Sequence, residues 1–156
     1  MAGTVDVVEF DLGSERYALD IHLIREIVEM IPITPIPRAP AHITGVINLR
    51  GEVTNIMNLN TVLGLPFKGT ENTQKIIVFM PEAAKGNNVG VIVDSVMSVT
   101  TVSEDQVERK NRSIADGAPQ FIKGIIKIDS ADASGSEKRL VLWLDLEKVL
   151  DEVSKK

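Results

Sequence analysis

The chain has 156 residues, of which 44% are apolar and 25% are charged. This size and composition suit one compact globular unit and exclude a disordered chain. The sequence contains no Cys, which excludes disulfide bonds, a thiolate nucleophile and a cysteine-ligated zinc. The formal net charge of −5 would repel a phosphate backbone, so we expect no nucleic-acid partner. No apolar run reaches the length of a membrane span, about 20 residues, and a signal-peptide pattern is missing, so we expect a cytoplasmic protein without membrane insertion.

The apolar residues are mainly aliphatic, with 18 Val, 17 Ile and 12 Leu against four Phe, one Tyr and one Trp, and this β-branched content favours strands. Apolar runs at residues 5–12 and 17–19 flank a turn and predict a β-hairpin. Asp20 then occupies the position of a helix N-cap, and the following apolar spacing predicts a short amphipathic helix. Its apolar face would hold Ile21, Ile24, Ile27, Val28 and Ile31, and its polar face His22, Arg25, Glu26 and Glu29.

The next segment is rich in proline. Four Pro residues between 32 and 40 predict a stiff, extended connector, because proline fits neither a helix interior nor a central strand. Residues 43–49 and 53–59 predict two paired strands around a tight turn at Arg50-Gly51-Glu52, and residues 61–65 close this unit. The polar stretch at 68–74 predicts a surface loop and the internal boundary of the chain.

A second series of strands follows this boundary. Strands are predicted at 76–80, 89–93, 96–102, 121–128 and 140–146, with loops at 81–88 and 130–136. The polar stretch at 103–119 begins with a candidate helical turn at 103–106, and a terminal helix is predicted at 147–156.

The two series resemble each other, which indicates an internal duplication. Residues 43–49 match 122–128 position by position, and residues 56–63 match 143–150. A weaker similarity precedes each of these segments. The hairpin that contains Phe10 and ends at Leu19-Asp20 resembles the hairpin that contains Phe79 and ends at Val93-Asp94. Duplication of one small β unit predicts two sheets of four to six short strands each, curled into small barrels.

Residues that could catalyse a reaction are sparse. The two histidines, His22 and His42, lack the spacing of a metal site, and we interpret both as surface residues. Phosphate-binding glycine motifs and a nucleophile elbow are missing from the sequence, so we expect no enzyme activity, no metal and no cofactor. Glu26 and Arg50 lie within runs otherwise suited to burial or tight turning, and we expect them to form a salt bridge.

Several segments point to a known family. Segments at 7–13, 17–21, 24–27, 33–37 and 45–51 in the first half, and at 90–96 and 142–150 in the second, follow an order that resembles the CheW family of chemotaxis coupling proteins. The turn Asn48-Leu49-Arg50-Gly51, placed after a proline-rich connector, is a fairly specific part of this pattern.

The resemblance implies an all-β fold of two SH3-like five-stranded β-barrels packed side by side in one domain over residues 1–156. The boundary between the two β subdomains would lie near 68–75, with a strand or a terminus crossing between them. The implied function is that of a non-catalytic adaptor in two-component signal transduction. It would join the cytoplasmic hairpin tip of chemoreceptors to the regulatory domain of the histidine kinase CheA, in the cytoplasm, recruited to membrane-associated receptor arrays.

The resemblance also implies two binding surfaces. The receptor would occupy a hydrophobic groove at the junction of the barrels, lined by Val8, Ile21, Ile24, Val96 and Met97. Glu26 and Arg50 stand at the paired acid and arginine of the family, and Gly45 at its glycine before the turn. The kinase would contact an edge of the first barrel around Val53, Asn55 and Met57, where Asn55 replaces the proline of many relatives.

Alternatives of two kinds stay open at this point. A detached regulatory domain of CheA, or a CheV-like adaptor without its receiver, would share the architecture. Because the sequence carries no dimerisation, ATP-binding or receiver segment, we expect a free coupling protein. A small β-barrel hydrolase or an oligonucleotide binder would need an acidic pair in a cleft or a basic stripe with stacking aromatics, and the sequence indicates neither.

Overall fold

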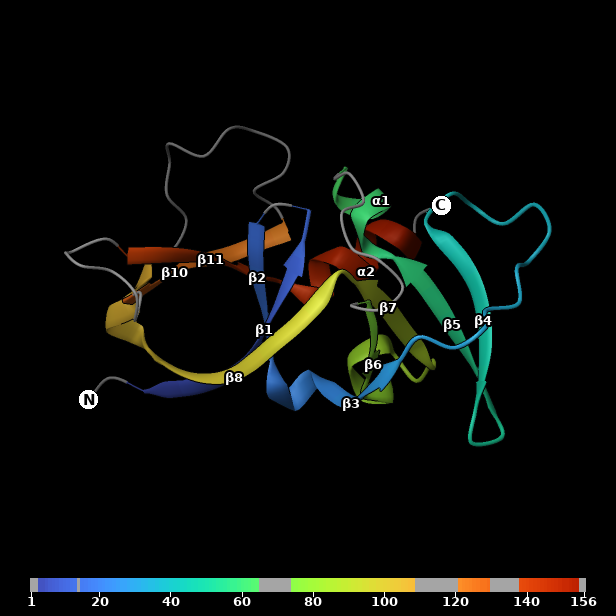
Figure 1. The fold of residues 1–156 in the computed structure, drawn as a ribbon, viewed down its shortest axis with the longest axis horizontal. Coiled ribbons are helices and arrows are strands. Elements are labelled where there is room, and N and C mark those ends of the chain that lie inside the picture. The colour runs from blue at the N-terminus through green and yellow to red at the C-terminus, as the bar shows by residue number, and fades with distance from the viewer. Residues whose placement is uncertain (1–2, 14, 65–73, 109–120, 130–137, 155–156) are drawn as a thin grey trace.

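The protein is mainly β and forms two sheets that lie side by side (Figure 1). The computed structural model describes residues 3–13, 15–64, 74–108, 121–129 and 138–154. We name the two halves by their sheets. Subdomain A has the strand order β8-β1-β2-β11-β10-β9, and subdomain B has the order β3-β6-β7-β5-β4. Both agree with the predicted size of four to six strands.

The strands of subdomain A are β1 (Thr4–Leu12), β2 (Glu15–Asp20), β8 (Ser95–Ser103), β9 (Val107–Glu108), β10 (Ile122–Asp129) and β11 (Lys138–Leu144). Those of subdomain B are β3 (Ile24–Glu29), β4 (Ile43–Leu49), β5 (Glu52–Asn58), β6 (Lys75–Phe79) and β7 (Val89–Val93). The helices are α1 (Leu59–Leu63) and α2 (Leu146–Ser154), with 3₁₀ turns η1 (Ile21–Leu23), η2 (Pro81–Ala84) and η3 (Glu104–Gln106). Neighbouring strands are antiparallel except β2 with β11 and β5 with β7, which are parallel.

The hairpins, the turn at 103–106 and the terminal helix are confirmed, but the helix predicted over 21–31 is wrong. Only η1 is helical, and β3 begins at Ile24 and pairs antiparallel with β6. The β-branched residues of this segment fit a pleated strand, and the hydrogen bonds to β6 outweigh a helical spacing of only two or three turns. As a result the faces change: Glu26 and Val28 are partly buried on one face of the strand, whereas Ile27 is exposed on the other.

Each subdomain takes strands from both halves of the chain. The chain leaves subdomain A after β2, runs through η1 into β3, and returns from β7 to β8 (Figure 1). The hairpin β1–β2 therefore joins β8–β11, and the hairpin β6–β7 joins β3–β5. The two halves thus exchange a hairpin.

The predicted boundary near 68–75 falls largely on residues 65–73, and parts of the predicted loops at 103–119 and 130–136 also lie outside the described residues, so these stay predictions.

The internal duplication agrees with this topology. Position by position, β8-β1-β2-β11-β10 corresponds to β3-β6-β7-β5-β4, each with one parallel pair at the same place. The pairing register shifts at Gly45 in β4 and at Gly124 in β10, the glycines that the sequence match aligns. A Cβ atom at Gly45 would collide with the backbone of Thr34, and one at Gly124 would lie 2.8 Å from Val107 Cγ1. Both bulges therefore require glycine.

The largest hydrophobic cluster lies between the subdomains. It combines Phe10 and Leu19 of subdomain A with Phe79 and Val91 of subdomain B, all fully buried. Each barrel has in addition a smaller core of its own, one around Trp143 and one around Ile56 and Ile76. Burying one large aliphatic or aromatic side chain contributes about 1.5–3 kcal/mol, so this shared core holds the two barrels together as one folding unit.

Helix α2 reinforces the junction. Asp145 caps its first turn, because the Asp145 carboxylate accepts a hydrogen bond from the Lys148 amide at 3.3 Å. Leu146 and Val149 belong to the shared core, and Asp151 forms an ion pair with Lys85 beside η2 at 3.4 Å. The helix follows β11 of subdomain A but packs against η2 of subdomain B, and it lies between the two sheets in Figure 1.

Candidate functional site

Two segments carry the chain from one subdomain to the other: η1 with the start of β3, and the start of β8. We call them the crossover segments, and both present partly exposed apolar residues. Ile21 in η1 is 39% exposed, and Met97 in β8 is 48% exposed. Ile24 and Val96, at the starts of β3 and β8, are half-buried and pack on the shared core. Both segments lie against β1, because β8 hydrogen-bonds along it and η1 contacts it. We call these four residues together with Val99 the crossover surface.

The predicted groove residue Val8 does not line this surface. Val8 is buried, and its register partners are Leu19 in β2 and Val99 in β8. Val8 therefore shares its sheet face with Val99, because directly paired residues of neighbouring strands point to the same face, but as a buried side chain it adds no exposed area to the crossover surface. Sequence reasoning missed Val99, which is 56% exposed and which the alternation of β8 could have placed beside Met97.

The expected salt bridge between Glu26 and Arg50 is present. Arg50 stands at the tip of the β4–β5 hairpin, in a two-residue turn in which Arg50 and Gly51 both have positive φ (52° and 87°), as a type I′ turn requires. Arg25 extends the network to Glu52 at 3.2 Å. β3 and β4 are the two outer strands of the sheet, so this network links β3 to the far end of the same sheet.

Gly45 lies away from the charges and has a packing role. It is buried in β4, where the backbone of Thr34 crosses closely and pairs with Val46 through two hydrogen bonds of 2.9 Å. The predicted extended connector is confirmed at Thr34, which lies along the outer edge of β4, but the connector turns at residues 37–38, where Arg38 has a positive φ of 63°. The close approach explains the glycine without any contact to a partner.

The predicted kinase contact is only partly at the surface. Val53 is 64% exposed and Asn55 is exposed, whereas Met57 is buried in the shared core. The segment is a central strand of its sheet, because β5 lies between β4 and β7 and pairs with β7 from Asn55 onward. The parallel pairing of β5 with a hairpin from the other half of the chain could not be foreseen from local sequence. Only the first residues of β5, at the hairpin end, are free of β7.

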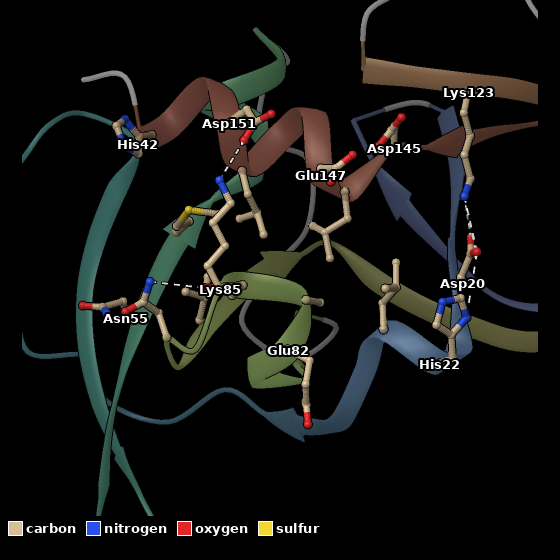
Figure 2. A pocket seen from close by; sticks show the side chains of 18 of the residues that line it. Asp20, His22, His42, Asn55, Glu82, Lys85, Lys123, Asp145, Glu147 and Asp151 are labelled. Carbon is tan, nitrogen blue, oxygen red and sulfur yellow. Dashed lines mark hydrogen bonds and ion pairs between the residues drawn. The ribbon is translucent and has the colours of Figure 1, made fainter.

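A cleft of about 510 Å³ opens between the subdomains (Figure 2). Asn55 and Met57 line one wall, α2 and η2 form another, and η1 contributes His22 and Leu23. Its charged lining residues are Asp20, Glu82, Lys85, Lys123, Asp145, Glu147 and Asp151. His42 is buried at this cleft, which corrects its interpretation as a surface residue, whereas His22 is exposed. Sequence reasoning missed the cleft, because its walls come from distant parts of the chain.

The described residues contain no group of three or more His, Asp or Glu side chains that could hold a metal ion. Among the helices in this part of the chain, none is long and apolar enough to cross a membrane.

Comparison with known proteins identifies the family. Residues 6–154 match the model of the CheW-like domain. The chemotaxis protein CheW of Thermotoga maritima is 30% identical over 97% of this chain and 91% of its own, and CheW of Rhizobium meliloti is 31% identical over 94% and 88%. The crystal structure of the scaffolding protein TtCheW from Thermoanaerobacter tengcongensis superposes with a TM-score of 0.78 at 28% identity, over 94% of this chain and 92% of that one. This neighbour confirms the fold of two SH3-like subdomains. The chain therefore belongs to the CheW-like family and is a chemotaxis scaffold protein.

Proposed function

We propose that this protein couples chemoreceptors to the regulatory domain of the histidine kinase CheA by binding both, without catalysing a reaction. The observation that carries the proposal is the crossover surface, where partly exposed apolar side chains stand at the junction of the two subdomains. The scaffold would act in the cytoplasm, at arrays of membrane-associated receptors. Its family membership supports this role.

The crossover surface suits the apolar face of a receptor helix. Ile21, Met97 and Val99 offer exposed apolar area, and the half-buried Ile24 and Val96 form the base on which a helix could lie. Recognition of a helix in such a groove depends on a few apolar anchors spaced along the helix. Glu26 and Arg50 would orient the helix through charged contacts.

The kinase would bind the end of subdomain B. Val53 is the most exposed large apolar residue among those described, and it stands next to the β4–β5 turn. Asn55 is held by Asn88, whose carbonyl accepts hydrogen bonds from the Asn55 amide at 2.9 Å and from its side chain at 3.4 Å. This fixed, partly apolar end would pack against a barrel of similar shape in the kinase, with Met57 supporting it from within.

Binding measurements on charge-introducing variants test the proposal. We expect Ile21→Asp and Met97→Asp to weaken binding of a soluble cytoplasmic receptor fragment at least about tenfold, because each places a charge in an apolar contact. Both should bind the CheA regulatory domain as the wild type does. Val53→Asp should weaken binding of the CheA regulatory domain at least about tenfold and leave binding of the receptor fragment unchanged. Calorimetric titration of each variant with each partner provides the data.

Leu140→Asp is the matched control, because Leu140 is also more than half exposed on subdomain A but lies on β11, away from the crossover segments. It should leave both affinities unchanged. Wild-type receptor affinity in both Ile21→Asp and Met97→Asp would contradict the receptor assignment. Unchanged kinase affinity in Val53→Asp would contradict the kinase assignment.

A further inference from the structure

Each crossover begins at a buried aspartate. Asp20 is the last residue of β2, directly before η1, and Asp94 directly follows β7, before β8. Both are more than nine-tenths buried. They occupy equivalent places in the two repeats, because β2 and β7 hold the same position in the two strand orders. Burying a carboxylate costs free energy unless charged or hydrogen-bonding partners compensate, so the partners of each aspartate indicate what the residue holds in place.

Asp20 is bound by the opposite hairpin of its own sheet. The indole Nε1–H of Trp143 in β11 donates to Asp20 Oδ1 at 2.5 Å, and Lys123 Nζ of β10 lies 3.3 Å from both carboxylate oxygens. Lys123 Nζ also lies 4.4 Å from the centre of the Trp143 ring, a cation–π contact. Figure 2 shows Lys123 pointing at Asp20 beside His22. Although Asp20 precedes η1, its side chain does not cap that turn.

Asp94 is bound by the first hairpin. The amide of Gly13, in the β1–β2 turn, donates to Asp94 Oδ2 at 2.8 Å. The Asp94 amide in turn donates to the Asp11 carbonyl at 3.0 Å. Ser95, the first residue of β8, donates its hydroxyl to the Asp11 carboxylate at 2.9 Å. The point where the chain enters subdomain A is thereby fixed on β1.

We propose that Asp20 and Asp94 are positioning residues that hold the two crossover segments at fixed places on subdomain A, and that they thereby set the relative positions of Ile21 and Met97. Ile21 directly follows Asp20, and Met97 lies three residues after Asp94. This inference rests on the proposed receptor surface. A helix-binding surface made of two chain segments depends on their mutual placement, because a shift of about 1 Å displaces apolar anchors from their contacts.

The variants Asp20→Asn and Asp94→Ala test the proposal. Asn keeps the size of the Asp20 side chain but removes the charge that binds Lys123. Ala removes the carboxylate that accepts the hydrogen bond from the Gly13 amide, whereas Asn would keep an acceptor there, because the other Asp94 oxygen, Oδ1, has no hydrogen-bond partner. We expect each variant to weaken receptor-fragment binding about tenfold. Affinity for the CheA regulatory domain should change less than twofold, because Val53 and Asn55 lie on subdomain B.

Asp6→Asn is the matched control. Asp6 lies on β1 and accepts a hydrogen bond from the hydroxyl of Thr101 in β8 at 2.6 Å, so it also ties β8 to β1, but at the end remote from the crossover. It should leave receptor affinity within twofold of the wild type. If Asp20→Asn does not fold, Lys123→Met replaces it, because Lys123 is partly exposed and its loss removes the same ion pair.

A second readout does not depend on the receptor. Methyl NMR of the free protein should show shifted Ile21 signals in Asp20→Asn and shifted Met97 signals in Asp94→Ala, with Leu140 unchanged in both. Trp143 is the only Trp of the chain, so its fluorescence reports whether the Asp20 site has changed.

The two readouts separate the outcomes. Unmoved Ile21 and Met97 signals, or receptor affinity within twofold of the wild type in folded variants, overturns the positioning role. An equal loss of affinity for both partners overturns it too, because it indicates general destabilisation. If the wild-type protein does not bind the receptor fragment, the proposed function fails, whereas the methyl signals still decide the positioning role.

Discussion

Tyr17 gives the molecule a titratable group in its core. Its ring stacks on Phe10, with ring centres 6.2 Å apart, and its side chain belongs to the cluster between the subdomains. Burial raises the pKa of the Tyr17 hydroxyl above its ordinary value of 10.0, and the nearby Glu15 carboxylate adds to the shift. The neutral phenol is therefore the form that the fold favours.

The raised pKa of Tyr17 predicts a loss of stability in alkali. Above the pKa of the unfolded chain, near 10, the folded state binds more protons than the unfolded state, so the free energy of unfolding falls as pH rises through the folded-state pKa. We expect Tyr17→Phe to lose less stability between pH 9 and about 11 than the wild type does. Urea unfolding at several pH values measures this. Tyr17 is the only tyrosine, so absorbance at about 295 nm follows its titration directly, and a midpoint at the ordinary value would contradict the prediction.

At the scale of elements, β3 differs most from its sequence-based prediction. Helical spacing over 21–31 is real in the sequence, but a segment this short gains more from pairing with β6 than from its own turns. Glu26 consequently shares a face with Val28, and from there it reaches Arg50 on the β4–β5 hairpin. The sequence indicated the ion pair correctly even though the element carrying Glu26 was predicted wrongly.

The ion-pair network of β3 should contribute little to stability. The Arg50 side chain is 63% exposed, and exposed pairs contribute at most about 1 kcal/mol because water and salt screen them. We expect a double-mutant cycle of Glu26→Gln and Arg50→Ala, measured by urea unfolding, to give a coupling energy below about 1 kcal/mol that falls further in 1 M salt. A coupling above about 2 kcal/mol would show instead that the network holds the barrel closed.

At the scale of the whole molecule, the hairpin exchange makes the two halves interdependent. Residues 1–64 contain β1–β5 and residues 74–156 contain β6–β11, so neither half alone has the strands of a complete barrel. The shared core likewise draws on both halves. We therefore expect a stable folded state only when both halves of the chain are present.

Fragment complementation tests this interdependence. We expect fragments 1–64 and 74–156 to be largely unfolded when separate, because each leaves apolar strand faces and sheet edges without partners. Mixed together, they should recover the strand signal in far-UV circular dichroism and the native fluorescence of Trp143. A fragment that folds cooperatively by itself would contradict this prediction.

The sequence alone determined the elements with strong local signals: the hairpins, the position of the tight turn at Arg50-Gly51 and the match between the segments that contain Gly45 and Gly124. These depend on side-chain alternation and on the backbone freedom of glycine, which neighbouring residues specify. The tertiary structure decided that β5 is a central strand, that Val8, Met57 and His42 are buried, and that a cleft opens beside α2. Pairing between strands from different halves of the chain depends on long-range hydrogen bonds and shared burial, and local patterns carry no information about which distant strand a given strand will pair with.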